Sequence, residues 1–289
     1  MKNIIQFIVI ATLVSITFLG INAQEQTLVK TTEGSTATEK VEKKNESAEK
    51  RQSNSDDDSW RGFYVGGYVG NSNGRATPQI SIAFDPNGFY NDFSLSRRNK
   101  AGIQKIQSNG LNGGGTVGYN IQKGHFFIGG EADFGGQKID KTVTGTFPFA
   151  DNINNLPFTF KQSIKSNWML TARPRAGVAF KKVIVYATGG IAITNLKYAG
   201  TFTETFSSVV EKGSFSKVKT GWTAGAGIEF KVARRWSVKG DYLFSQFGRV
   251  SAISNDFQAQ QFNDTTINVF THSTDLKSHS IRFGINYRF

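Results

Sequence analysis

Charged residues of opposite sign recur at alternate positions in several short stretches of this chain. Carboxylates stand at Glu131, Asp133, Glu229 and Asp241, and cations at Arg173, Arg175, Lys231, Lys239 and Arg282. Alternate residues of a strand point to one face, so neighbouring charges would share a face. Buried charges are costly unless they are paired, and the near balance of signs predicts a salt-bridged network inside the fold. The alternative is a narrow ion or proton path lined by the same residues.

The three histidines, His125, His272 and His279, give no support for catalysis. No two of them have a spacing that indicates a shared site with a nucleophile and a base. The chain has no cysteine, which excludes disulfides, thiol chemistry and a cysteine-based metal site. We therefore expect no enzymatic activity and no metal.

The excess of basic residues predicts a surface that binds anions. The formal charge is +12, and residues 60–289 hold 27 of the 34 basic and 13 of the 22 acidic residues, or +14. Such a surface attracts lipopolysaccharide phosphates, sulfated glycans or haem propionates. Arg97, Arg98 and Lys100 lie in a long expected loop and are candidates for contacting such anions. Nucleic acid is not expected as a partner of a secreted chain.

The elements that position these residues are strands. From Trp60 onward the polarity of the chain has a period of two, which favours strands over helices. Between residues 280 and 289, Ile281 and Phe283 alternate with Arg282 and Gly284. Further alternating segments lie near residues 61–72, 111–121, 126–134, 168–180, 183–197, 222–231 and 236–245. Several apolar faces end in aromatics, such as Trp222 and Phe230, which is typical of the interfacial girdles of membrane barrels.

The connections alternate in length. Long gaps are expected near residues 73–107, 138–163, 198–215 and 250–275, and short ones near 122–124, 181–182 and 232–235. This alternation is typical of long extracellular loops and short periplasmic turns. It predicts an all-β fold: an eight-stranded antiparallel up-and-down transmembrane β-barrel, closed because an open sheet edge in lipid leaves backbone groups unpaired. The interior of such a barrel is just wide enough for side chains to fill.

The first 59 residues precede this barrel domain. Lys2, the apolar run from Ile4 to Leu19 and the small residue Ala23 predict a cleaved signal peptide over residues 1–23. Residues 24–59 are polar and charged, with almost no large apolar side chain, and predict a disordered periplasmic linker. The expected location is the cell outer membrane.

The barrel segments resemble a known family. The segments are WRGFYVGGYVG (60–70), GGTVGYNIQ (114–122), FIGGEADFGG (127–136), RPRAGVAF (173–180), YATGGIA (186–192), GWTAGAGIEFKV (221–232), WSVKGDYLFSQFG (236–248) and SIRFGINYRF (280–289). They are similar to the small outer-membrane β-barrels of alphaproteobacteria, which include surface proteins of the porin family and haemin-binding proteins. The terminal Phe289, with Tyr287 before it, also resembles the signal read by the barrel-assembly machinery.

The resemblance and the basic loops together motivate haemin as a ligand. His272, His279 or Tyr90 would supply an axial ligand, and Arg97, Arg98 or Lys100 would pair with the propionates. The competing interpretation is that these are ordinary solvated residues that meet lipopolysaccharide. We expect a structural surface barrel that captures haemin or other anions with its outer loops. A host-contact protein and a narrow porin-like channel are the alternatives.

Overall fold

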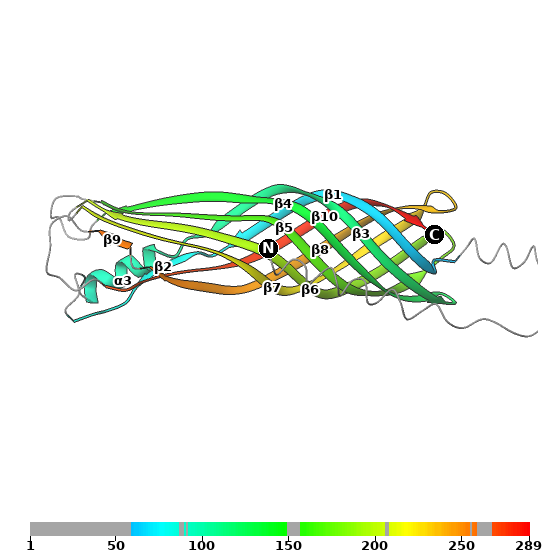
Figure 1. The fold of residues 1–289 in the computed structure, drawn as a ribbon, viewed down its shortest axis with the longest axis horizontal. Helices are drawn as coiled ribbons and strands as arrows, with labels where there is room; N and C mark the ends of the chain where they lie inside the picture. The colour runs from blue at the N-terminus through cyan, green and yellow to red at the C-terminus, as the bar shows by residue number, and fades with distance from the viewer. Residues whose placement is uncertain are drawn as a thin grey trace, which may run out of the picture. The chain divides into compact units, whose positions relative to one another are not determined.

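The computed structural model describes residues 59–86, 90, 92–148, 157–205, 208–254, 256–258 and 268–289. The predicted signal peptide and nearly all of the predicted linker lie outside these residues. Eight long antiparallel strands form a ring: β1 (Gly62–Ala76), β3 (Ile106–Lys123), β4 (Phe126–Pro148), β5 (Pro157–Ala179), β6 (Val183–Glu204), β7 (Val209–Lys231), β8 (Trp236–Ser254) and β10 (Phe270–Arg288). The predicted eight-stranded barrel is confirmed (Figure 1).

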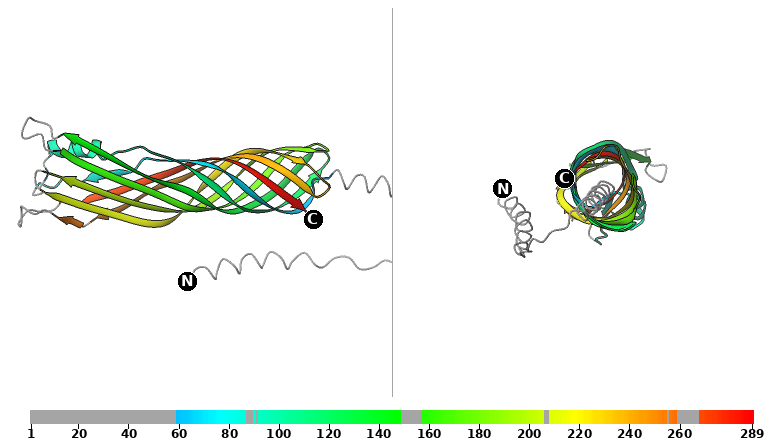
Figure 2. Two further views of the ribbon diagram at one scale, coloured as in Figure 1. Left: turned by 90° about the horizontal axis from the view of Figure 1, so that it is seen from above. Right: turned by 90° about the vertical axis from the view of Figure 1, so that its right-hand side faces the viewer.

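The first and last long strands close the ring. β1 pairs with β10 from Tyr64 opposite Arg288 to Arg75 opposite Lys277, without a register shift. Each of the other neighbours in the ring follows its predecessor in the sequence, as an up-and-down meander requires. The end-on view in Figure 2 shows the closed ring. Closure removes the free edges that a membrane does not tolerate.

The short connections lie together at one end, which we call the turn end. Gly124 and His125 join β3 to β4, and residues 180–182 and 232–235 make the other two turns. A Cβ at Gly124 would meet nothing within 4 Å, so lack of space does not require glycine there. The φ of +61° does, because residues with a side chain rarely adopt it. Glycine at the first position suits a two-residue hairpin.

The opposite end, which we call the loop end, carries three short elements. β2 (Gln79–Ile82) follows β1 after the interruption at Pro78 and pairs with β10, while β9 (Asp256–Gln258) pairs with β7. The helix α3 (Asp92–Ala101) lies between β2 and β3 (Figure 1). No helix among the described residues is long and apolar enough to cross a membrane.

The strands are longer than the sequence indicated. β4 to β7 have 22 or 23 residues each, so segments expected as outer loops, such as 138–148, 157–163 and 209–215, are strands. The predicted loop boundaries are therefore wrong at the loop end. The three short turns lie where they were expected.

An exposed apolar belt surrounds the turn-end part of the barrel. Leu111 is 75 % exposed and Phe126 is 71 % exposed, and they belong to a continuous apolar surface much larger than soluble proteins expose to water. The larger belt residues are Phe63, Val69, Leu111, Val117, Tyr119, Ile121, Phe126, Ile128, Phe134, Phe180, Val185, Ile191, Trp222, Ile228, Phe230, Trp236, Val238, Tyr242, Ile281, Phe283, Ile285 and Phe289. A belt of this kind faces hydrocarbon in membrane barrels.

Beyond the belt the polarity of the strands is reversed. In β5, Leu170 faces outward and Arg173 is buried, whereas further along Lys161 is exposed and Phe160 is buried. Register shifts accompany the change, between Gly136 and Ile139 in β4 and between Lys165 and Met169 in β5. In β5 a bulge moves the following side chains to the other face, since the buried positions change from odd numbers such as Arg173 to even numbers such as Ile164. In β4 the buried positions stay odd, and the residue type at them changes instead, from Glu131 to Ile139.

The ring also opens beyond the belt, into two facing sheets. The β3–β4 ladder ends at Asn112 opposite Gln137, and the β7–β8 ladder ends at Gly221 opposite Phe247. The loop-end half therefore consists of one sheet of β4 to β7 and a second sheet of β8, β10, β2 and the ends of β1 and β3. It comprises residues 73–86, 95–110, 137–148, 157–167, 195–205, 208–220, 247–254 and 268–279.

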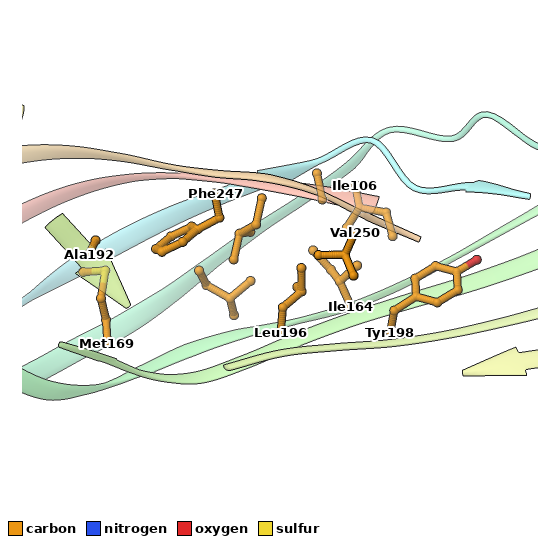
Figure 3. Packing of buried hydrophobic residues seen from close by; sticks show 11 residues of the cluster. Ile106, Ile164, Met169, Ala192, Leu196, Tyr198, Phe247 and Val250 are labelled. Carbon is orange, nitrogen blue, oxygen red and sulfur yellow. The ribbon is translucent and has the colours of Figure 1, made fainter. Parts of the chain in front are cut away.

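Two apolar clusters fill the space between these sheets. The cluster nearer the belt contains Ile106, Ile139, Ile164, Met169, Leu196, Phe247, Val250 and Leu276 (Figure 3). The cluster nearer the loop end contains Ile80, Ile82, Tyr90, Leu95, Phe158, Phe160, Phe202, Val209 and Phe270. The loop-end half is thus packed like a β-sandwich.

The belt predicts that lysine substitutions at two equally exposed positions have different effects on stability. Phe283 in the belt and Val218 in the loop-end half are each 65 % exposed and both face outward. We expect Phe283→Lys to lower the free energy of unfolding in lipid vesicles by about 2–4 kcal/mol, because an ammonium near the bilayer centre loses its water. Val218→Lys, the matched control, should change it by less than about 0.5 kcal/mol. Urea titrations followed by tryptophan fluorescence measure both, and equal effects would contradict a lipid-facing belt.

Candidate functional site

The predicted interior charges meet inside the belt. Glu131 of β4 is the centre of the group: Arg173 donates to its Oε1 at 2.8 Å and Lys239 to its Oε2 at 2.9 Å. Arg175 approaches the same carboxylate at 3.4 Å, and the Tyr64 hydroxyl donates to it at 2.7 Å. A single carboxylate therefore holds two cations from the neighbouring strand β5 and one from β8 across the barrel.

A second branch runs across the barrel from β4 to β10. Asp133 accepts hydrogen bonds from Arg173 and, at 3.1 Å, from Arg282. Arg282 also binds Asp241 through two nitrogens, at 2.7 Å and 3.2 Å. The two-pronged geometry gives this pair more rigidity than a single contact would.

A third branch lies nearer the turn end around Glu229. Ser237 donates to it at 2.5 Å and Asn286 at 2.9 Å, while Arg175 and Arg288 approach at 3.4 Å and 3.8 Å. Lys231, which was also predicted for the interior network, is only half-buried. Its ammonium donates to the Ser59 carbonyl at 3.0 Å and lies 5.1 Å from the Trp60 ring centre.

Tyrosines join the network, and the sequence pattern did not single them out. The Arg175 guanidinium lies 4.6 Å from the Tyr64 ring and 5.1 Å from the Tyr186 ring. Arg282 lies 4.4 Å from the Tyr68 ring. Cation–π contacts of this kind stabilise a guanidinium that has lost water. Alternation in the first strand was less clean, and this obscured the fact that Tyr64 and Tyr68 point inward.

A layer of neutral polar side chains separates the charges from the apolar clusters. Gln137 donates to Ser166 and Thr194, at 2.6 Å and 3.1 Å. Ser72 shares hydrogen bonds with Ser280 and Asn112. These groups are buried. The described interior therefore passes from charged to polar to apolar contacts, which suits a solid plug rather than a water path.

The structure corrects the prediction that His272 lies in an outer loop. His272 belongs to β10 and is 1 % exposed. Its Nε2 and the Glu211 carboxylate are 2.8 Å apart, and its Nδ1 and the Tyr198 hydroxyl are 3.2 Å apart. A Cβ at Gly213 would lie 2.3 Å from the ring, so glycine there makes room for the imidazole. Both ring nitrogens are engaged inside the sandwich.

Two of the predicted loop residues are also buried, contrary to the expectation of exposed ligands. Tyr90 donates to Glu204 Oε2 at 2.5 Å, and Arg98 donates to Glu204 Oε1 at 2.8 Å. The Arg98 guanidinium lies 4.3 Å from the Tyr90 ring. Burial, followed by the neighbouring Glu204 carboxylate, raises the pKa of Tyr90 far above its ordinary value. The phenol therefore stays protonated and acts as a hydrogen-bond donor.

The remaining loop candidates are exposed. Arg97 and Lys100 of α3 both face solvent, on the side of the helix away from Leu95 and Arg98. They belong to a larger group of exposed basic residues on the loop-end half: Arg75, Arg97, Lys100, Lys105, Lys138, Lys141, Lys161, Lys165, Lys197, Lys212, Lys217, Arg249 and Lys277. Among the described side chains of that half, Asp140 is the most exposed carboxylate, and Asp85 and Asp275 are half-buried. The outer surface is therefore strongly cationic.

The histidines are not gathered into a site. His125 is exposed at the first turn, and His279 bonds the Tyr242 hydroxyl at 2.7 Å on the outer face of β10. Within the described parts of the chain, no group of three or more His, Cys, Asp or Glu side chains could hold a metal ion.

The predicted assembly residues end the last strand. Phe289 is 68 % exposed, and its ring lies 5.2 Å from the Tyr287 ring and 5.6 Å from the Phe63 ring. The Phe289 N–H donates to the Phe63 carbonyl at 3.1 Å. Phe289 thus lies in the girdle at the turn end.

A closed antiparallel barrel with an apolar belt, aromatic girdles and a charged interior defines an outer-membrane β-barrel protein. The model of the outer membrane protein beta-barrel domain family matches residues 51–289. The chain belongs to this family, and the protein is located in the outer membrane.

Its relatives are alphaproteobacterial outer-membrane proteins. The 31 kDa outer-membrane immunogenic protein of Brucella melitensis is 28 % identical over 233 residues, which cover 80 % of this chain and 84 % of the relative. The 22 kDa outer membrane protein of Rhizobium leguminosarum is 24 % identical, covering 80 % and 79 %. Among solved structures, the outer membrane protein OprG of Pseudomonas aeruginosa has a TM-score of 0.35 and 10 % identity, covering 79 % and 97 %.

The interior network predicts an asymmetry between charge substitutions. Glu131→Ala leaves three buried cations without their shared carboxylate, and we expect it to lower the free energy of unfolding by about 3–5 kcal/mol. Asp140→Ala removes an exposed carboxylate that pairs with Lys165 at 3.1 Å, and we expect a loss below about 1 kcal/mol. Urea titrations in vesicles measure both. Similar small losses for the two variants would show that Glu131 is not needed to hold the network.

Proposed function

We propose that the protein is a closed structural barrel of the outer membrane whose loop-end half presents a basic surface that captures anionic ligands. The observation that carries the structural role is the filled interior. The charge network around Glu131 lies inside the belt, and two apolar clusters lie beyond it. A barrel of this size has no room left for a wide water channel.

A filled interior leads to a conductance prediction. The full mature chain, reconstituted in planar bilayers at high salt, should give no discrete current steps, because the buried ion pairs leave no continuous hydrated path. A general porin reconstituted in the same bilayers serves as the control. Reproducible steps from the folded protein would support the porin-like alternative instead.

The capture role is supported by the charge of the outer surface. Exposed lysines and arginines are spread over both sheets of the loop-end half, with Asp140 as the most exposed carboxylate among its described side chains. Clustered charge of one sign attracts anions from a distance and raises their local concentration. Haemin, with two propionates, is one candidate ligand, and phosphate-bearing lipids are another.

The geometry restricts how haemin would bind. His272 and Tyr90 use their polar atoms inside the sandwich, so axial coordination by either would require the loop end to open. Arg97 and Lys100 are exposed and suited to the propionates. Haemin capture would then depend on surface charge rather than on a buried iron ligand.

A haemin titration tests this view of capture. We expect Arg97→Gln/Lys100→Gln to weaken the apparent affinity by roughly threefold to tenfold, since two exposed ion pairs contribute at most about 1 kcal/mol each. We expect His272→Gln to leave the affinity unchanged, because the ring does not reach the surface. Absorbance in the Soret region follows binding, and Lys161→Gln/Lys197→Gln is the matched charge control. Loss of binding in His272→Gln alone would mean that the sandwich opens to expose an iron ligand.

A host-contact role remains the alternative proposal. The Brucella relatives are named immunogenic proteins. In this chain, Phe84 and Val269 are 56 % and 45 % exposed at the loop end, beside the hydrogen bond from the Ala83 N–H to the Val269 carbonyl. Exposed apolar residues on an outer surface suit protein contacts.

Recognition by the barrel-assembly machinery is part of the same proposal. Phe289 and Tyr287 end the strand that closes the ring, and Phe289 stays exposed in the finished barrel. We infer that these two aromatic side chains are what the machinery contacts, because both lie on the outer face of the barrel.

A further inference from the structure

A groove of about 690 Å³ lies on the outer face where β1, β3, β8 and β10 meet. Strand pairing brings its cations together. Arg75 of β1 lies opposite Lys277 of β10 and, on its other side, opposite Gln107 of β3. Lys105 lies two residues from Gln107 and so on the same face. All three basic side chains are exposed and line the groove.

These cations lack an internal counterion. Like charges directly opposite each other in a ladder are destabilising, so the pair Arg75 and Lys277 costs stability unless an anion binds. The carboxylate in the lining is Asp275, whose Oδ1 accepts the Thr77 N–H at 2.7 Å. No described carboxylate forms an ion pair with Arg75, Lys105 or Lys277. The groove therefore carries a net positive charge.

The groove lies directly beside the aromatic girdle at the top of the belt. His279 and Phe244 line the side of the groove that faces the belt, with ring centres 4.9 Å apart. Phe244 packs against Trp222 at 5.2 Å, and His279 bonds the Tyr242 hydroxyl. Such aromatics mark the level of lipid headgroups. The cations are therefore at the height of the phosphates of the surrounding lipid.

Below the groove, the same strand offers an apolar surface. Ile281, Phe283 and Ile285 follow Lys277 and His279 on the outward face of β10 and are 57 %, 65 % and 47 % exposed. A second groove of about 690 Å³, almost entirely apolar, is lined by Phe283 and Ile285 together with Gly240. A molecule with an anionic head and long acyl chains would contact both grooves, which a free phosphate ion would not.

We propose that Arg75, Lys105 and Lys277 form a binding site for a phosphorylated glycolipid of the outer leaflet, with its phosphates in the basic groove and its acyl chains along β10. The inference rests on the proposed anion capture and specifies one ligand class and one site for it. The site holds lipid at a fixed position on the barrel wall and would leave the rest of the basic surface free.

The experiment compares two charge variants of the full mature chain. The groove variant is Arg75→Gln/Lys105→Gln/Lys277→Gln, and the control is Lys161→Gln/Lys197→Gln/Lys212→Gln, which removes the same charge from exposed positions of β5, β6 and β7. Native mass spectrometry in detergent measures bound lipid A in its bisphosphorylated and dephosphorylated forms. Heat-dependent gel mobility verifies that each variant is a folded barrel.

We expect the unaltered protein to retain bisphosphorylated lipid A and the groove variant to bind it roughly tenfold less tightly, as the loss of three exposed ion pairs implies. The control should bind like the unaltered protein, and dephosphorylated lipid A should bind weakly to all three. Inorganic phosphate should compete poorly, since it makes no apolar contacts. Equal losses in both variants would overturn the site and leave general anion capture intact. Retention of lipid A by the folded groove variant would also overturn it.

Discussion

The rest of this structure depends on closure of the backbone ladder within the membrane. Hydrocarbon offers no partner to an unpaired N–H or C=O, so every strand of the belt must have two neighbours. The pairing of β1 with β10 meets this demand. Closure with eight strands leaves a narrow interior, so inward side chains must contact one another, and polar ones must be matched in hydrogen bonds and charge. The Glu131 network follows from this constraint. Where the belt ends the constraint ends too, and the β3–β4 and β7–β8 ladders separate.

The two halves of the barrel therefore consist of the same strands but are stabilised in different ways. Within the belt, water is absent outside and polar groups are gathered inside. Beyond it, water surrounds the protein and the apolar residues are gathered inside, as in a soluble sandwich. His272 with Glu211 and Arg98 with Glu204 show that even there, buried polar groups occur in pairs. The exposed cations are left on the outside, where they are available to ligands.

The sequence predicted the parts of the strands in which apolar residues alternate with polar ones and face outward. The belt strands and inward charges such as Arg173 and Arg282 follow from one apolar and one polar face. The loop-end half was not predicted because the apolar side of the strands changes from outward to inward, so that Phe160 and Ile164 face inward while the belt residue Leu170 faces outward. Arg98 and His272 were expected at the surface because partners such as Glu204 and Glu211 are remote in sequence. Arg288 rather than Lys231 approaches Glu229, a choice that depends on how the last residues of two strands are placed.

The reversal of polarity along the strands also fixes how deeply the barrel is immersed. Sliding it outward along the bilayer normal would bring apolar residues such as Leu111 into water, and sliding it inward would bring Lys161 and Lys165 toward hydrocarbon. Either displacement is opposed by a free-energy cost that rises with each residue moved. The level near Gly136 and Lys165, where the outward side chains change from apolar to charged, therefore marks the outer boundary of the hydrocarbon region. Vertical position in the membrane is set by the same feature that turns a lipid-facing wall into a sandwich.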